Sequence, residues 1–130
     1  MFRILKERCI YISKLKGKRI VVFLEDNYED LEFWYPYLRF LEEGAEVKAV
    51  APEQKSYIGK YGYPAQPDLN TGEVNPQDFD AVIVPGGYAP DRMRRYPEMF
   101  DFVKKLFDEG RVVAAICHGP WMLVSAGVLQ

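Results

Sequence analysis

Residues 112–120 read VVAAICHGP and carry the strongest single indication of the architecture. The apolar run at 112–116 is rich in β-branched residues and predicts a buried strand, and the proline that ends the segment is tolerated in the first turn of a helix. Cys117 therefore lies between a strand and a helix, with the small residues Ala115 and Gly119 two positions away on either side. This spacing predicts a sharp turn that holds the cysteine out into a crevice, as in the nucleophile elbow of hydrolases.

The same alternation of strand and helix extends toward the N-terminus. Short apolar runs at 20–24 and 81–84 and an extended run at 47–51 predict three further strands. Apolar residues at steps of three and four predict a helix after the first strand and another before the last, and a third helix begins near Pro120 and ends at Gly127. This order indicates an α/β fold with a mostly parallel sheet. The apolar positions of the first two helices are Leu31, Trp34, Leu38 and Leu41, followed by Phe100, Val103, Leu106 and Phe107.

Length and composition indicate one domain. The chain has 130 residues, of which 48% are hydrophobic, enough for one buried core and too few for two. Residues 52–78 interrupt the alternation with repeated prolines and glycines, and we interpret them as a long excursion that contains an edge hairpin. We assign residues 1–17 to a basic N-terminal extension and residues 18–130 to the α/β domain.

The basic extension has two interpretations. Residues 1–19 hold seven basic groups against one acid, a balance of +6, so residues 20–130 carry a net charge of −8. A basic arm can bind nucleic acid or a membrane surface. However, apolar residues at positions 2, 5, 9 and 12 recur at helical spacing, which favours a docked amphipathic helix with a solvated charged face. We therefore expect neither a nucleic-acid nor a membrane partner, and charges interrupt the segment too early for a secretory signal.

The counts of reactive residues exclude several mechanisms. The two cysteines, Cys9 and Cys117, are too few and too far apart for a disulfide scaffold or a cysteine-rich zinc site, which favours a reducing compartment and a cytoplasmic location. The single histidine, His118, excludes mechanisms that need two imidazoles, including that of the HExxH metalloproteases. No apolar run approaches the roughly 18 residues that a bilayer requires. We expect no metal and no cofactor.

Three segments follow strands of the predicted sheet and should meet at its carboxyl edge, where ligands bind in α/β folds. They are residues 25–30, 85–91 and 117–119. Cys117 is the candidate nucleophile in the third segment, because the unpaired amides at the start of the following helix stabilise a thiolate. The alternative is that Cys117 is a small buried apolar residue at the end of a strand.

The other candidates at this edge would stabilise charge or move protons. Glu29 either leans toward Cys117 or caps the following helix. Gly86 and Gly87 can bring backbone amides close to a substrate oxygen, although ordinary turns use such residues too. The His118 amide is the safer oxyanion donor of that residue, while its imidazole is either a base or a capping or surface group.

Four motifs link the chain to a known family. From Lys18 to Gln130 the sequence resembles the PfpI (ThiJ) family of intracellular cysteine hydrolases, part of the class I glutamine-amidotransferase-like superfamily. The resemblance implies a flavodoxin-like three-layer sandwich in which Cys117 is the nucleophile, Glu29 is the carboxylate beside it, and the amides of Gly87 and His118 are the oxyanion donors. The motifs are NYEDLE at 27–32, YPY at 35–37, PGGYAPD at 85–91 and AICHGP at 115–120.

The resemblance also implies that the protein forms a homo-oligomer, and that the chain is shorter than the family fold. Family peptidases complete a Cys-His-acid triad with a carboxylate from a neighbouring subunit, at the position of Asp91, where an aspartate is one methylene shorter than the expected glutamate. We therefore expect a homo-oligomer, a dimer or a hexamer, with an intermolecular active site. The chain ends at Gln130, 13 residues after Cys117, so the C-terminal part of the family fold is expected to be missing.

The leading hypothesis is a cysteine hydrolase of the peptidase type, in which the Cys117 thiolate attacks a peptide carbonyl. The second is a cofactor-independent glyoxalase or deglycase that acts on small carbonyl compounds such as methylglyoxal. The third is a stress protein without enzymatic activity, in which Cys117 is oxidised to a sulfinic acid and senses the redox state.

Overall fold

The computed structural model describes residues 13–129, so the helix expected over residues 2–12 lies outside the described residues. Five strands form one sheet in the order β5-β2-β1-β6-β7, and every neighbouring pair is parallel. The strands are β1 (Arg19–Phe23), β2 (Glu46–Ala51), β5 (Leu69–Asn70), β6 (Ala81–Val84) and β7 (Val112–Ala115).

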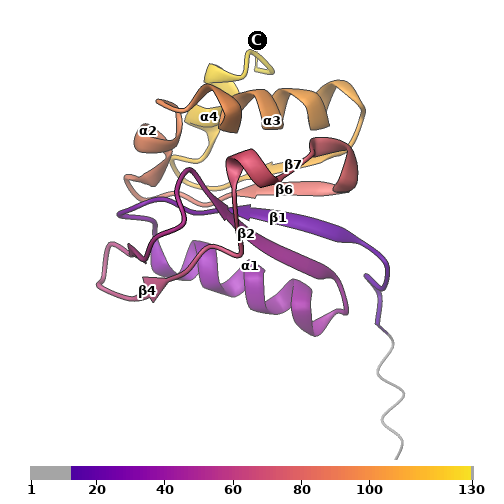
Figure 1. Cartoon of the computed structure of the whole chain (residues 1–130), viewed down its shortest axis with the longest axis horizontal. Coiled ribbons are helices and arrows are strands. Elements are labelled where there is room, and N and C mark those ends of the chain that lie inside the picture. Colours follow the sequence, from indigo (N-terminus) through magenta and orange to yellow (C-terminus); the bar gives the residue numbers. More distant parts are fainter. Residues whose placement is uncertain (1–12, 130) are drawn as a thin grey trace, which may run out of the picture.

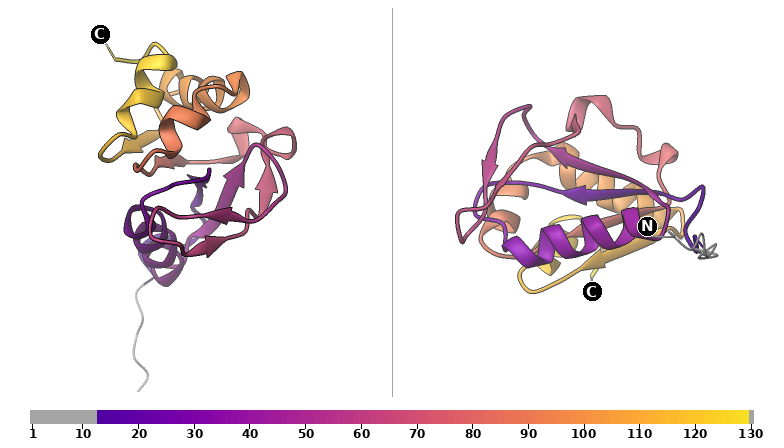
Figure 2. Two further views of the ribbon diagram at one scale, coloured as in Figure 1. Left: turned by 90° about the vertical axis from the view of Figure 1, so that its left-hand side faces the viewer. Right: turned by 90° about the horizontal axis from the view of Figure 1, so that it is seen from below.

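Helices lie on both faces of this sheet. One face carries α1 (Asp30–Glu42), and the other carries α2 (Ala89–Met93), α3 (Pro97–Asp108) and α4 (Pro120–Ser125) (Figure 1). A view turned by 90° shows the same three layers (Figure 2). The flavodoxin-like α/β sandwich is thereby confirmed, whereas the short helix α2 was not predicted. Among the described residues, none of the helices has the length and apolar character that a membrane span requires.

The central strands form the middle of the core. In β1, Val21 and Val22 are fully buried, and so are Val82 and Val84 in β6. Strands covered by helices on both faces place every side chain in the core, which explains why they are continuous apolar runs without alternation. On the α3 side, the rings of Phe23 and Phe102 lie 5.6 Å apart in a tilted arrangement.

The helix α1 is present, but of its predicted apolar stripe only Trp34 packs against the core, and the three leucines do not. Leu31 is 74% exposed, and Leu38 and Leu41 are exposed too. The face that packs on the sheet is aromatic, with Phe33 only 1% exposed and stacked on Tyr37 at a ring separation of 5.6 Å. Apolar residues occupy several faces of this helix, and period alone does not distinguish the buried face.

Two short antiparallel strands, β3 (Tyr57–Ile58) and β4 (Pro64–Ala65), form the expected hairpin. It makes a separate two-stranded sheet, and the edge of the main sheet belongs instead to β5. The hairpin is bonded to the loop after β1, because the Asn27 amide donates to the Ile58 carbonyl oxygen (2.8 Å) and the Ile58 amide donates to Asp26 Oδ1 (3.0 Å). Two 3₁₀ turns, at Thr71–Glu73 and Pro76–Asp78, then lead to β6.

Candidate active site

The loops after β1, β6 and β7 meet at the carboxyl edge of the sheet, as expected for parallel strands. The first two are joined by a short antiparallel bridge. The Glu29 amide donates to the Gly86 carbonyl oxygen (3.1 Å), and the Tyr88 amide donates to the Asn27 carbonyl oxygen (2.9 Å). Backbone hydrogen bonds therefore hold these two loops in register, without any side chain.

Gly87 allows this close approach. Its φ is 75°, a left-handed conformation that disfavours any residue with a Cβ. A Cβ at this position would also lie 2.4 Å from the Asn27 carbonyl oxygen and 2.5 Å from the Glu29 amide nitrogen. Both conformation and space thus require glycine here.

The predicted strand-to-helix turn is present, and Cys117 is at its centre. β7 ends at Ala115, α4 begins at Pro120, and Cys117 has a φ of 59°. A left-handed conformation at a non-glycine residue is strained, and strain of this kind is typical of nucleophile elbows. Gly119 is needed for packing, since a Cβ there would lie 2.4 Å from the carbonyl oxygen of Val84. The Cys117 side chain is exposed, so it is not the buried apolar residue that was the alternative.

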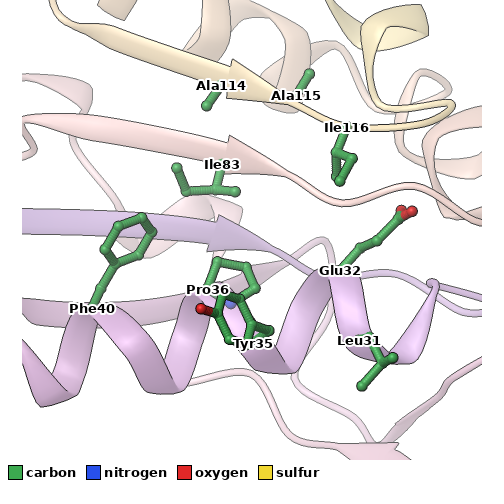
Figure 3. A pocket seen from close by; sticks show the side chains of 9 residues that line it. All are labelled: Leu31, Glu32, Tyr35, Pro36, Phe40, Ile83, Ala114, Ala115 and Ile116. Atoms are coloured by element: carbon green, nitrogen blue, oxygen red, sulfur yellow. The ribbon is translucent and has the colours of Figure 1, made fainter.

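The Glu32 carboxylate lies close to this cysteine. A Cβ on Gly86 would lie 2.7 Å from Cys117 Cβ and 2.4 Å from Glu32 Oε2, so the cysteine and the carboxylate border the same small space. The Gly86 amide donates to Glu32 Oε2 at 2.8 Å. Figure 3 shows the Glu32 side chain directed from α1 toward the end of β7 near Ile116. It also shows the largely apolar groove that continues from Glu32 between α1 and β7.

Glu29, the acid expected beside the cysteine, is the N-cap of α1. Its Oε2 accepts a hydrogen bond from the Glu32 amide at 3.0 Å. Glu29 therefore has the alternative role expected for it, that of a helix cap. Glu32, three residues later, lies at the position beside Cys117 that was proposed for Glu29. The sequence held a partial signal for this: once Glu29 is taken as the cap, Asp30 and Glu32 are the remaining acids of the NYEDLE motif. Asp30 accepts hydrogen bonds from the amides of Tyr61 and Tyr63 in the hairpin, which leaves Glu32.

The candidate oxyanion donors divide into two groups. The Gly86 amide is already bonded to Glu32. Within residues 13–129, the amides of Gly87 and His118 make no hydrogen bond and remain able to donate to a substrate oxygen. The oxyanion role of these two amides stays a prediction, with which their lack of a partner is compatible.

The His118 imidazole points toward the loop after β6. Its Nδ1 lies 3.2 Å from the Gly87 carbonyl oxygen. Because a carbonyl oxygen can only accept, we assign the proton to Nδ1, which leaves Nε2 free to accept a proton. The ring also packs on Trp121, with 5.0 Å between the two ring centroids.

Asp91 lies in the first turn of α2, where Arg95 Nη2 donates to its Oδ2 at 3.2 Å. The structure describes one chain, so the contact of Asp91 with His118 of a partner subunit stays a prediction, as does the homo-oligomer. Among the described residues, no three side chains of His, Cys, Asp or Glu come together as a metal site would require.

A second buried acid, Glu25, follows β1 directly and was not singled out from the sequence. It is 4% exposed, and its Oε1 accepts a hydrogen bond from the Asp26 amide at 2.7 Å. Burial raises the pKa of Glu25, and the neighbouring Asp26 charge acts in the same direction. The carboxyl group thus helps to define the start of the loop that leads to Glu29 and Glu32.

Comparison with known proteins gives consistent matches. A model described as the DJ-1/PfpI family matches residues 18–130. Deglycase PfpI of Pyrococcus furiosus is 48% identical over 111 residues, which cover 85% of this chain and 67% of the relative. Protein/nucleic acid deglycase 2 of Escherichia coli is 37% identical over 116 residues, which cover 88% of this chain and 67% of the relative. The chain thus spans about two thirds of the length of these relatives.

A solved structure agrees with both the sequence and the fold. It is a two-domain protein from Anabaena variabilis that contains dj-1/thij/pfpi-like and ferritin-like domains. The TM-score is 0.85 at 38% sequence identity, and the match covers 87% of this chain and 33% of that one.

Proposed function

This chain belongs to the DJ-1/PfpI family, and from that membership we propose that it is a cysteine-dependent deglycase. Its substrates are small α-oxoaldehydes and the adducts that they form with amines and thiols. The observation that carries the proposal is the pairing of Cys117, held at a φ of 59°, with the Glu32 carboxylate across the space left by Gly86. A nucleophile and a proton carrier beside each other are what this chemistry needs.

The reaction begins when the Cys117 sulfur bonds to the aldehyde carbon, and the aldehyde oxygen takes up a proton. The product is a hemithioacetal. A base then removes the hydrogen from the sulfur-bearing carbon and gives an enediolate. A proton returns to the adjacent carbon, and the proton of the first hydroxyl group passes to the second oxygen, which leaves a thioester of a 2-hydroxy acid. Water hydrolyses the thioester and frees the thiol. One carbon is oxidised while its neighbour is reduced, so no external oxidant or reductant is consumed.

Each step has a candidate group in the site. The amides of Gly87 and His118 stabilise the oxygen that becomes negatively charged. The Glu32 carboxylate moves the proton between the two carbons, and Nε2 of His118 is a second acceptor. With an adduct as substrate, the amine or thiol of the modified molecule leaves as the Cys117 bond forms.

This assignment ranks deglycase chemistry above peptidase chemistry, which was the leading hypothesis from the sequence. Both curated relatives described above are named deglycases. Within this chain, the His118 imidazole is oriented by a backbone carbonyl and not by a carboxylate, so a Cys-His-acid triad needs Asp91 from another subunit. Deglycase chemistry needs only groups that one chain already places together.

A comparison of substrates tests the proposal. We expect the protein to convert methylglyoxal to lactate and to release amino acids from their methylglyoxal adducts, with no cleavage of fluorogenic peptides. Lactate formation followed by NMR and peptide fluorescence give the two rates. Peptide cleavage without lactate formation would restore the peptidase hypothesis. Inactivity on both, with peroxide-dependent mass gain at Cys117, would favour the redox sensor instead.

A pair of isosteric substitutions tests the carboxylate assignment. Glu32→Gln should lower kcat for methylglyoxal by about 100-fold, because general acid–base catalysis typically contributes that much or more. Glu29→Gln should leave kcat nearly unchanged, since the amide oxygen can still accept the cap hydrogen bond from residue 32. Steady-state kinetics of both variants decide the matter. A larger loss from Glu29→Gln would return the role to Glu29.

A further inference from the structure

An open hollow of about 520 Å³ adjoins the candidate active site on its His118 side. Two arginines and two aromatic residues contribute to its wall. The neighbouring groove between α1 and β7, in contrast, is lined mainly by apolar side chains. The hollow is lined by Asn27, Tyr88, Asp91, Arg92, Arg95 and Trp121.

The hollow is connected to the reacting groups by one ring contact and by one residue that adjoins Gly87 in the chain. The Trp121 ring in its wall packs on the His118 ring at 5.0 Å. Tyr88, on the opposite loop, directly follows Gly87, whose carbonyl oxygen lies 3.2 Å from His118 Nδ1. The hollow therefore begins next to the two amides that are able to hold a substrate oxygen.

The charges around the hollow leave a positive excess. Arg95 is paired with Asp91 at 3.2 Å, and this aspartate is the one acid of the lining. Arg92 makes no hydrogen bond or ion pair with the described residues, and its side chain is exposed. The nearby acid Glu25 is buried and already bonded to the Asp26 amide. The positive charge of Arg92 partly offsets the raised pKa of Glu25, so the two groups attract each other, but no ion pair forms between them. Arg92 is therefore the cation of the lining whose guanidinium nitrogens have no hydrogen-bond partner among the described residues.

Two further cations border the aromatic residues of the wall. Lys60 Nζ lies 5.8 Å from the centroid of the Tyr88 ring. The Arg94 guanidinium lies 5.9 Å from the centroid of the Trp121 ring, and its Nε donates to Ser125 Oγ at 3.0 Å. Neither residue lines the hollow, so neither contacts a ligand held inside it.

We propose that this hollow is an anion subsite, in which Arg92 binds a carboxylate on the substrate while the carbonyl carbon of the same molecule faces Cys117. The planar guanidinium can hold both carboxylate oxygens at once, which a lysine cannot do. The inference rests on the proposed function and adds a preference within its substrates: small carbonyl compounds that carry a carboxylate should bind more tightly than neutral ones such as methylglyoxal. Tyr88 and Trp121 provide flat walls for the carbon skeleton between the two ends.

Alkylation of Cys117 measures the subsite without requiring turnover. Iodoacetate carries a carboxylate next to its reactive carbon, and iodoacetamide is its neutral counterpart of nearly the same shape. The ratio of their rates at Cys117, followed by mass spectrometry of the Cys117 peptide, reports attraction of the anion. We expect Arg92→Gln to lower this ratio about threefold to fivefold, which is typical of one solvent-exposed charge contact, and to leave the iodoacetamide rate unchanged.

Arg94→Gln is the matched control, because it removes the same charge from the same helix end but lies outside the lining. We expect it to leave the rate ratio near the wild-type value, and Arg92→Lys to give an intermediate ratio because the charge remains without the planar fork. Equal losses from Arg92→Gln and Arg94→Gln, or no loss from either, would overturn the subsite. If Arg92→Gln lowers the ratio of the iodoacetate rate to the iodoacetamide rate as expected, but the wild-type protein does not turn over methylglyoxal, the proposed function is contradicted and the subsite is not.

Discussion

Cys117→Ala is expected to abolish lactate formation from methylglyoxal, with kcat/KM at least about 1,000-fold lower than that of the unchanged protein. The substitution removes the atom that bonds to the aldehyde carbon, and no other described residue offers a thiol. Because the Cys117 side chain is exposed, its loss leaves no cavity in the core, and the thermal midpoint should stay close to that of the unchanged protein. Steady-state kinetics and thermal unfolding measure the two effects.

Two controls sharpen this result. Cys9→Ala removes the other thiol of the sequence and should retain full turnover. Cys117→Ser keeps a similar shape and tests whether an oxygen can replace the sulfur, and we expect it to be nearly as inactive as the alanine variant because a hydroxyl is a far weaker nucleophile. Turnover that survives in Cys117→Ala would remove this cysteine from the mechanism.

Gly87→Ala is expected to cause the largest loss of stability, about 3 kcal/mol or more in the free energy of unfolding. The left-handed φ of 75° disfavours alanine by about 1–2 kcal/mol. The new Cβ would also meet two backbone atoms, at 2.4 Å and 2.5 Å, so the loops after β1 and β6 must separate. That separation weakens the two bridging hydrogen bonds, each worth about 1 kcal/mol.

Gly62→Ala is the control for this prediction. Gly62 has a φ of 90°, but no atom lies within 4 Å of the added Cβ, so the variant suffers the conformational penalty without the clash. Urea denaturation of both variants gives the two losses, and the difference between them isolates the close approach of the loops. If the two losses were equal, the approach of the loops at Gly87 would contribute nothing to stability.

The strands and the main helices could be predicted because burial determines where apolar residues occur along the chain. Buried strands are short apolar runs, and helices have apolar residues at steps of three and four. Continuous apolar runs of about four residues in β1 and β6 correspond to strands covered on both faces, and β2 follows the same pattern with one interruption at Lys48. The face of α1 could not be predicted in the same way. Leu31 and Phe33 are both large and apolar, and the partner that buries one of them is a sheet assembled from distant segments.

The candidate site, too, could be predicted from the sequence only in part. The elbow around Cys117 could be located from local spacing, because a tight turn constrains residues two positions away on either side. The identity of the neighbouring carboxylate could not, since Glu29 and Glu32 belong to one motif and differ by less than one helical turn. Arg92 and Arg95 could not be identified as site residues from the sequence, because nothing in their spacing indicates that they lie beside His118.

Local order along the chain was therefore enough to specify the α/β class, the parallel sheet and the turn that presents Cys117, because strand, helix and turn each constrain residues within a few positions of one another. Tertiary contacts alone decided which acid reaches the cysteine. The Gly86 amide bonds to Glu32 across 54 positions of sequence, while Glu29 is held at the helix cap by a neighbour three positions away. A hydrogen bond within the first turn of α1 positions the Glu29 side chain. The Glu32 side chain is positioned by the loop after β6, which comes close to α1 only in the folded protein.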